Sequence, residues 1–538
     1  MSSRPCAGHE LTRRGKDAGT RSTSTTNGIS VTATSTPPQT AGPHDAPETT
    51  AAGNRTIIAI LLVATFVVIL NETIMNVALP SLMTDLDVTA RTGQWLSTVF
   101  LLTLAIVIPT TGYLLQRLTT RQVFVTAMIL FSSGTLLAAV SPAFWLLLPA
   151  RVVQASGTAM MLPLLITTIL TLVPVERRGV VMGNVTIVIS VAPAIGPTVS
   201  GIVLHFFPWR FMFILVLPIA LAALAFGVRK LVNVGTPGES KLDVLSVVLT
   251  VPAFGGIVYG LSQLGASGPF GIPPIAFIGV GALALAAFSW RQTRLYRSGN
   301  PLLDLRAFRF APFTISVALL CAAMVSLFGM VILLPIYLQE VRGIGALETG
   351  LMLLPGGLVM GLLGPQVGKL YDRYGPRGLT LIGSVLLVVS MWRLSTIDLT
   401  TSIWMLIAIH VLLSIGLAFL FTPGFTTGLN PLPPHLYSHG SAILSTLQQV
   451  AGAAGTALLI AIYAGRSAAL QTGGAAPDAS ALGGIQLAFG IGALISLSTV
   501  VLAAFMHNTK KVDAELADTG LSDPGGDQHE PVAYGAHH

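Results

Sequence analysis

Residues 57–80 read IIAILLVATFVVILNETIMNVALP, an apolar run long enough to cross the roughly 30 Å hydrocarbon core of a bilayer as one helix. Glu72 lies inside this run, and no other long apolar segment of the chain carries a carboxylate near its middle. A charged side chain at that depth costs roughly 2.5 to 3.5 kcal/mol on insertion scales. We therefore expect Glu72 to have either an electrostatic partner or a function.

The composition extends this interpretation to most of the chain. Of the 538 residues, 52% are hydrophobic and only 9% are charged, whereas soluble domains carry about 25% charged residues. The sequence therefore predicts an all-α integral membrane protein with fourteen transmembrane helices. The predicted spans are 57–80, 94–116, 122–140, 143–172, 181–206, 210–228, 243–263, 273–290, 312–338, 347–369, 378–396, 402–422, 439–464 and 483–506.

Basic residues predict how these helices are oriented, because cytoplasmic loops carry an excess of Lys and Arg. Most of the basic loop residues fall in alternate loops, and these are Arg117, Arg121, Arg177, Arg178, Arg229, Lys230, Lys241, Arg291, Arg294, Arg297, Arg306, Arg309, Lys369, Arg373 and Arg377. We expect these loops and both polar tails, 1–55 and 508–538, to be cytoplasmic, and the tails to be disordered. The net charge of +7 is then explained by topology, which argues against nucleic-acid binding.

Two loops at corresponding positions resemble each other. Residues 112–124 read GYLLQRLTTRQVF, and residues 368–380 read GKLYDRYGPRGLT. Internal repeats of this kind are typical of transporters built from related halves. The second copy fits the pattern G-x-L-x-D-R-x-G-x-R of the major facilitator superfamily, which the chain therefore resembles.

Further segments resemble the drug:proton antiporter branch of that superfamily, which has fourteen spans. They are LNETIMNVALP in the first span, RVVQASGTA (151–159), APAIGPTVSG (192–201) followed by PWRFMF, and the stretch 429–457, which is similar to the lincomycin-resistance type of efflux permease. The resemblance implies a major facilitator fold with two six-helix bundles, 56–230 and 298–507, and an inserted helix pair with linkers, 231–297. It also implies export of amphipathic drugs in exchange for protons across the plasma membrane, by a monomer without a cofactor.

The chain departs from this family pattern at two places. Asn71 stands where the family usually has Asp, and the acid is instead the next residue, Glu72, about 100° further around the helix. In the first loop copy the acidic position is Gln116, and Thr119 and Thr120 replace a glycine and a basic residue. Any charged lock between the halves should therefore depend on Asp372 in the second copy.

Arg151 is the predicted partner of Glu72 in proton coupling. Each residue lies about 12 Å from the outer end of its predicted helix, at a rise of 1.5 Å per residue. An opposite charge nearby favours the ionised carboxylate and so sets when it takes a proton. Two alternatives stay open: Glu72 pairs with a neighbour only to hold helices together, or Arg151 is a static counter-ion.

Other candidate residues follow from polarity inside the spans and from the motifs. The predicted substrate or cavity residues are Asn71, Asn76, Gln154, Gln448 and Gln449; the predicted helix-five motif residues are Pro193, Gly196, Pro197 and Gly201; and the predicted cytoplasmic gating residues are Gly112, Arg117, Arg121, Gly368, Asp372, Arg373, Gly375 and Arg377. For Gln154, an ordinary interhelical hydrogen bond is an equally good interpretation. His410 is expected to be a neutral hydrogen-bonded residue, and His439 to lie at the membrane interface.

Several other classes of protein are disfavoured. GLLGPQVGKL (361–370) lacks the spacing and the hydroxyl residue of a phosphate-binding loop, so ATP hydrolysis is not the expected energy source. The sequence shows no metal-like cluster of Asp, Glu, His or Cys, so we expect neither a metal nor enzymatic activity. A proton-coupled importer or facilitator of a small solute is the main alternative, and a channel is a weaker one.

Overall fold

A computed structural model describes residues 51–234, 242–263, 272–296 and 301–506. Every regular element in these ranges is helical. The long helices are α1 (Ala51–Asp85), α3 (Trp95–Arg117), α4 (Thr120–Ala139), α5 (Phe144–Leu172), α6 (Arg178–Phe206), α7 (Arg210–Lys230), α10 (Pro274–Leu295), α11 (Ala311–Ile336), α12 (Ala346–Tyr374), α13 (Pro376–Leu394), α14 (Ile403–Leu429), α15 (Tyr437–Thr472) and α16 (Pro477–Ala504). Two short helices, α8 (Val244–Thr250) and α9 (Gly256–Ser262), flank a π-helical turn at Val251–Gly255 and together form one further span.

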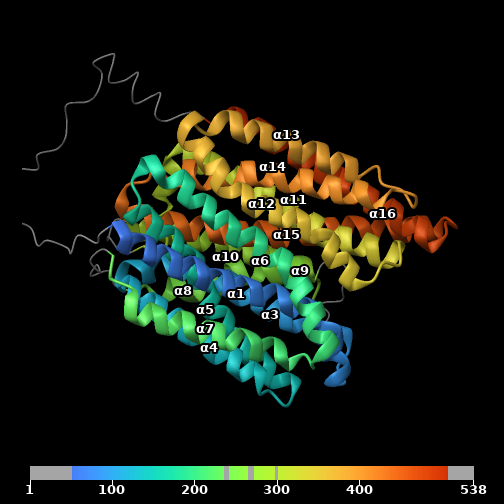
Figure 1. Ribbon diagram of the computed structural model, residues 1–538, viewed down its shortest axis with the longest axis horizontal. Coiled ribbons are helices and arrows are strands. Elements are labelled where there is room, and N and C mark those ends of the chain that lie inside the picture. Colours follow the sequence, from blue (N-terminus) through green and yellow to red (C-terminus); the bar gives the residue numbers. More distant parts are fainter. Residues whose placement is uncertain (1–50, 235–241, 264–271, 297–300, 507–538) are drawn as a thin grey trace, which may run out of the picture. The chain divides into compact units, whose positions relative to one another are not determined.

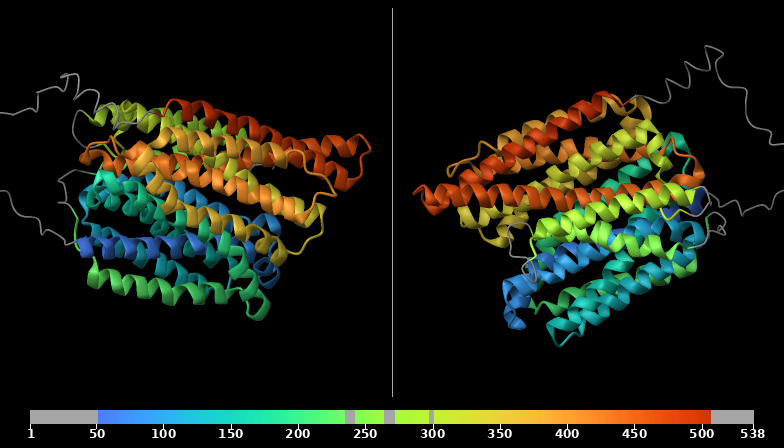
Figure 2. Two further views of the ribbon diagram at one scale, coloured as in Figure 1. Left: turned by 45° about the horizontal axis from the view of Figure 1, so that its top comes forward. Right: turned by 180° about the vertical axis from the view of Figure 1, so that it is seen from behind.

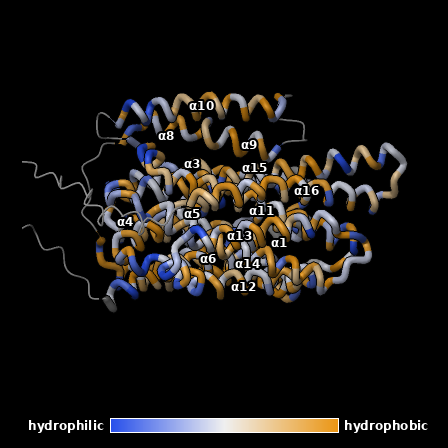
Figure 3. The backbone as a smooth tube through the Cα atoms, turned by 90° about the horizontal axis from the view of Figure 1, so that it is seen from above, coloured by the Kyte–Doolittle hydropathy of each residue, from blue (hydrophilic) through white to orange (hydrophobic). Residues whose placement is uncertain are grey.

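The described residues contain 14 segments long and apolar enough to cross a membrane, so the predicted number of spans is confirmed. Figure 3 shows the apolar residues along the helices and many of the hydrophilic ones near the helix ends. Backbone groups inside a bilayer must be hydrogen-bonded within the protein, which is why each apolar run forms a helix. Pro252 of the seventh span lies in the π-helical turn, where the regular hydrogen-bond ladder is locally displaced.

The long helices form two groups of six, one from each half of the chain. In the first group α1 packs against α5, α6 and α7, and α4 packs against α5 and α7. In the second group α11 packs against α14, α15 and α16, and α13 packs against α14 and α16. Figures 1 and 2 show the blue-to-green first group beside the yellow-to-red second group. This is the major facilitator arrangement, and its exact residue boundaries stay a prediction.

The two groups meet along two interfaces of different character. On one side α6 packs along α12, and backbones approach closely at Gly179, Gly183, Gly364 and Gly368. A methyl group on Gly183 would overlap the carbonyl oxygen of Gly364, and one on Gly364 would overlap that of Gly183. On the other side α3 packs against α15, and there the inserted helices cover the contact: α9 touches both α3 and α15 (Figure 2).

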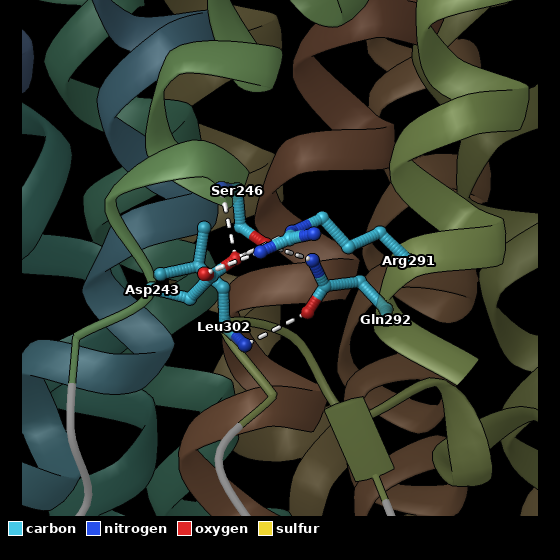
Figure 4. A network of polar contacts seen from close by, with 5 residues as sticks. All are labelled: Asp243, Ser246, Arg291, Gln292 and Leu302. Atoms are coloured by element: carbon cyan, nitrogen blue, oxygen red, sulfur yellow. Dashed lines mark hydrogen bonds and ion pairs between the residues drawn. The ribbon is translucent and has the colours of Figure 1, made fainter. Parts of the chain in front are cut away.

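A polar network holds the inserted helices together at the end where α8 begins (Figure 4). Asp243 caps α8 by accepting from the backbone N–H of Ser246 at 3.0 Å, and it also accepts from the Ser246 hydroxyl. Arg291 of α10 donates two hydrogen bonds of 2.7 Å to the same carboxylate. The next residue, Gln292, donates to Ser246 at 2.7 Å and accepts from the N–H of Leu302 at 2.8 Å, so it ties the pair to the segment that leads into α11.

Candidate functional site

Arg151 is the most completely buried charged side chain in the described part of the chain, with 1% of its surface exposed. Its Nη1 donates to Oε1 of Gln154, one turn along α5, at 2.6 Å, and its Nε reaches the carbonyl oxygen of Leu96 in α3 at 3.5 Å. The guanidinium also lies 4.0 Å from the centre of the Phe100 ring, a cation–π distance. Arg151 is thus held by α3 and α5 without needing a carboxylate to fix its position.

Gln154 extends this network to a third helix. Its Nε2 donates to the Thr135 hydroxyl of α4 at 2.8 Å, and that hydroxyl donates to the carbonyl oxygen of Phe131 at 2.7 Å. Both side chains are fully buried. The structure therefore gives Gln154 the interhelical hydrogen bond that was one of its two predicted interpretations. Thr135 was not among the predicted site residues.

Glu72 approaches the network from α1. Residue Glu72 as a whole is half-buried, and its carboxylate interacts electrostatically with Arg151, although no ion pair within 4.0 Å joins them. Within the described ranges, the carboxylate accepts no hydrogen bond. An acid that accepts no hydrogen bond and lies beside a fixed positive charge can gain or lose a proton without rearranging the hydrogen bonds around it.

The other predicted polar residues of α1 and α15 differ in their surroundings. Asn71 is 2% exposed and Gln448 is 3% exposed, and the amide nitrogen of each lacks a hydrogen-bond partner in the described structure. Gln449 lines a cavity between α3, α9, α11 and α15. Asn76 lies in α1, but its side chain is outside the part of the chain that is described.

The fifth span is α6, and its predicted motif residues pack it against helices of both groups. The Cβ position of Gly196 falls on the Thr73 side chain of α1, so only glycine allows that approach. Pro197 lies against Gly350 of α12, and Gly201 faces Leu347 of the same helix. Pro193 lies inside α6 and is partly buried. These residues serve contacts between helices rather than lining the Arg151 network.

Among the gating residues, Asp372 makes the decisive contacts. Its two carboxylate oxygens accept from the backbone N–H groups of Gly179 and Val180, at 3.1 and 3.2 Å. These groups lie in the first turn of α6, where the helix dipole attracts negative charge. Gly368 allows the approach, because its Cβ position would overlap the carbonyl oxygen of Gly179. Gly375 ends α12 with a positive φ of 80°, a conformation that favours glycine.

The first loop copy has no such acid and makes different contacts. Gln116 donates to the carbonyl oxygen of His435 at 3.1 Å, and Arg121 donates to that of Val228 at 2.6 Å. Gly112 packs against His439, with its Cβ position 3.2 Å from the ring Nδ1. Arg117 also has a bonded or electrostatic partner. Arg373 and Arg377 are exposed, and Arg373 lies over the Tyr374 ring.

His439 lies in the first turn of α15, near the end of its span, and its side chain is 3% exposed because that turn packs against Gly112 of α3. Its place at the membrane interface stays a prediction. His410 is buried, and its Nε2–H donates to the carbonyl oxygen of Leu353 at 3.0 Å. Among the described residues no three His, Cys, Asp or Glu side chains gather closely enough to hold a metal ion.

Arg178 is a further residue whose role sequence reasoning missed. It was counted as a loop cation, but it is 5% exposed and bridges the two groups. It donates to Asn430 Oδ1 at 3.2 Å and to the Tyr437 hydroxyl at 3.1 Å, as well as to carbonyl oxygens of its own group. Nothing in the pair Arg177–Arg178 reveals which of the two points inward.

Comparisons with known proteins agree with this architecture. Residues 61–456 match the model of the Major Facilitator Superfamily. The chain is 42% identical to the lincomycin resistance protein LmrB of Listeria monocytogenes, over 84% of this chain and 97% of that protein. It is 29% identical to the tetracenomycin C resistance and export protein of Streptomyces glaucescens, over 79% and 80% of the two chains.

Among solved structures, the human organic anion transporter MFSD10 has a similar fold, with a TM-score of 0.58 and 15% identity over 84% of this chain and 99% of that one. At that identity the likeness concerns the fold alone. The family match covers most of the chain, and the LmrB protein aligns over 97% of its length. The chain therefore belongs to the major facilitator superfamily.

Proposed function

We propose that the protein is a secondary active exporter that moves amphipathic drugs or antibiotics out of the cell in exchange for protons. The relatives named for lincomycin resistance and for tetracenomycin C resistance and export support the export of such compounds. The observation that carries the proton coupling is the Glu72 carboxylate, which accepts no hydrogen bond in the described structure and lies beside a fixed Arg151.

The mechanism follows from this arrangement. Because Arg151 is held by Gln154, Leu96 and Phe100, it keeps its place whether or not Glu72 is charged. When the protein opens outward, Glu72 takes a proton and its attraction to Arg151, or to a cationic substrate, is lost. When the protein opens inward, substrate binding favours release of that proton to the cytoplasm.

Several features accompany this function as part of the proposal. The protein lies in the plasma membrane as a monomer, with both tails and the Asp372 end of the helices in the cytoplasm, as the basic loops predict. The boundaries of the helix groups are those predicted above, 56–230, 231–297 and 298–507. The contacts of Asp372, Arg178 and Gln116 then close the cytoplasmic side, so the conformation described corresponds to a transporter closed to the cytoplasm.

The test is transport by Glu72→Gln in inverted membrane vesicles with an imposed pH gradient. We expect the variant to lose gradient-driven accumulation of lincomycin or ethidium by at least tenfold. It should keep exchange of labelled for unlabelled substrate, because exchange needs no net proton movement. Glu348→Gln, at an exposed carboxylate in the first turn of α12, is the matched control and should transport normally. Full gradient-driven transport by Glu72→Gln would refute the proposal.

A further inference from the structure

A cavity of about 160 Å³ lies where the inserted helices meet both helix groups. Thr98 and Leu101 of α3, Leu261 of α9, Phe328 of α11, and Gln449 and Thr456 of α15 contribute to its lining. An engineered apolar cavity of about 150 Å³ in another protein is large enough to bind benzene. The cavity is therefore large enough for one aromatic ring or an apolar group of similar size.

Unused polar groups distinguish this cavity from a simple packing defect. Thr98 is 9% exposed, and its hydroxyl makes no hydrogen bond in the described structure. The side chains of Gln449 and Thr456 also make none in that part of the chain. They lie seven residues apart, two turns of one helix, and so share a face of α15. A hydroxyl or amide left unpaired in an apolar setting is costly, so these three groups favour a ligand that hydrogen-bonds to them.

The lining also limits the charge of that ligand. None of the described residues that line the cavity is charged. An ion would lose its hydration there without gaining a counter-charge, which costs far more than burying a neutral polar group. The ligand that fits is a neutral amphipathic molecule with a ring-sized apolar part and hydroxyl or amide groups.

The same part of α3 borders both this cavity and the Arg151 network. Leu96 and Phe100 contact Arg151 on one face of the helix, while Thr98 and Leu101 line the cavity on another. At the same level, Trp95 stacks on Tyr259 of α9, with ring centres 5.8 Å apart. A ligand in the cavity would therefore contact the same turn of α3 that positions Arg151.

We propose that this cavity is a binding site for neutral amphipathic substrates, bounded on one side by the inserted helix pair. The inference rests on the proposed function, because it takes the ligand to be an export substrate. It assigns the inserted helices a role as one wall of a substrate site and places that site beside, rather than on, the proton-coupling residues. The opposite interface supports this choice, because the glycines of α6 and α12 bring two backbones together there.

Photolabelling tests the site directly. The probe is an azidophenyl analogue of chloramphenicol, a neutral aryl compound with hydroxyl and amide groups, and labelled residues are located by mass spectrometry in purified protein without a gradient. We expect labels within 98–101, 258–262 or 449–460, and competition by unlabelled chloramphenicol. Ala457→Phe, which fills the cavity, should reduce labelling at least fivefold, whereas Leu458→Phe, at a neighbouring residue that is 43% exposed and outside the lining, should not.

Two further variants separate the possible failures. Thr456→Val removes a hydroxyl at nearly constant volume and should reduce labelling threefold or more while the thermal midpoint stays unchanged, so that a folding defect in Ala457→Phe does not decide the result. Glu348→Gln, at an exposed carboxylate of α12 outside the cavity lining, should label like the wild type, and because labelling is measured without a gradient it tests the site even if the transport proposal fails. Labelling elsewhere, labelling unaffected by Ala457→Phe, or labelling competed by phospholipid but not by chloramphenicol would overturn the site.

Discussion

At the scale of single residues, the site is built around a cation rather than around the acid. Arg151 is fixed by Gln154 and by the carbonyl oxygen of Leu96, and Gln154 is fixed by Thr135, so these hydrogen bonds connect the three helices α3, α4 and α5. Glu72 lies beside these hydrogen-bonded residues and makes no hydrogen bond with them in the described structure. Arg151 therefore keeps its position when Glu72 gains or loses a proton.

The sequence predicted part of this site. The equal depth of Glu72 and Arg151 followed from helix rise alone, and the structure gives them an electrostatic interaction. Thr135 could not be predicted, because it precedes Gln154 by 19 positions on another helix and is one of many hydroxyls in the spans. Arg178 was missed for the same reason: a pattern of charges gives the membrane side of a residue but not its rotation about the helix axis.

Gln154→Leu should destabilise the protein and weaken coupling. It leaves the Arg151 donor and the Thr135 hydroxyl without their partner, and a hydrogen bond to a buried charged group contributes about 1.5–3 kcal/mol. We expect a lower thermal midpoint in detergent and about a tenfold loss of gradient-driven transport. Ser156→Ala, at a half-buried position of the same helix, is the control, since in the described structure its hydroxyl bonds only to the carbonyl oxygen of Val152. An unchanged midpoint in Gln154→Leu would contradict this role.

At the scale of elements, the two interfaces between the helix groups are unequal. Gly179 and Gly183 of α6 are spaced four residues apart, as are Gly364 and Gly368 of α12, so each helix presents a small-xxx-small pair to the other. Asp372 then reaches the first turn of α6 across this contact. The loop repeat in the sequence predicted the importance of Asp372, but the partner helix became known only from the packing.

Gly183→Leu should force this interface apart. Its side chain would meet the backbone of Gly364, which cannot move aside as a flexible side chain could. We expect the distance between spin labels at the exposed positions Glu176 and Arg373 to shift to longer values, with Asp372 released from α6. Gly378→Leu is the control, because nothing lies within 4 Å of the Cβ position there. Identical distance distributions for Gly183→Leu and wild type would show that the contact does not hold this side closed.

The ion pair between Asp243 and Arg291, which joins the inserted helices, should be insensitive to physiological pH. The hydrogen bonds from Arg291 hold the pKa of the Asp243 carboxyl at about 2, below its unfolded value of about 3.9. A depressed pKa stabilises the folded state above the unfolded pKa, and this contribution is lost as the pH falls through about 2. The thermal midpoint between pH 5 and 8 should therefore not change through Asp243.

Arg291→Gln tests whether this ion pair stabilises the protein. The pair is partly exposed, so we expect a fall of only about 1–3 °C in the thermal midpoint at pH 7. Arg294→Gln, whose arginine stacks on Trp290 in the same helix at 4.0 Å, should have less effect. A larger fall for Arg294→Gln than for Arg291→Gln would mean that the ion pair does not hold the inserted helices.

At the scale of the whole membrane domain, hydropathy was enough to predict fourteen spans, because each apolar run has only one way to satisfy its backbone in lipid. It could not predict which helices pack together. The inserted helices illustrate this limit, since their sequence predicts two spans, while their position over the α3–α15 contact depends on packing between distant segments. The wall that the inserted helices give to the cavity depends on this packing, so no short stretch of the sequence predicts it.

The proposed coupling makes a prediction about membrane potential that only the intact transporter in a sealed membrane can test. Glu72 is the one carboxylate in the middle of a long apolar segment, so one proton enters per cycle. Exchange of that proton for a neutral drug moves one elementary charge inward, and 100 mV, negative inside, then contributes about 2.3 kcal/mol, roughly a fiftyfold change in the accumulation ratio. Exchange for a monovalent cation moves no net charge. Export of chloramphenicol from proteoliposomes should therefore respond to a valinomycin-imposed potential, whereas export of ethidium should follow the pH gradient alone. Equal potential sensitivity for the two substrates would mean that more than one proton, or a second acid, takes part in the cycle.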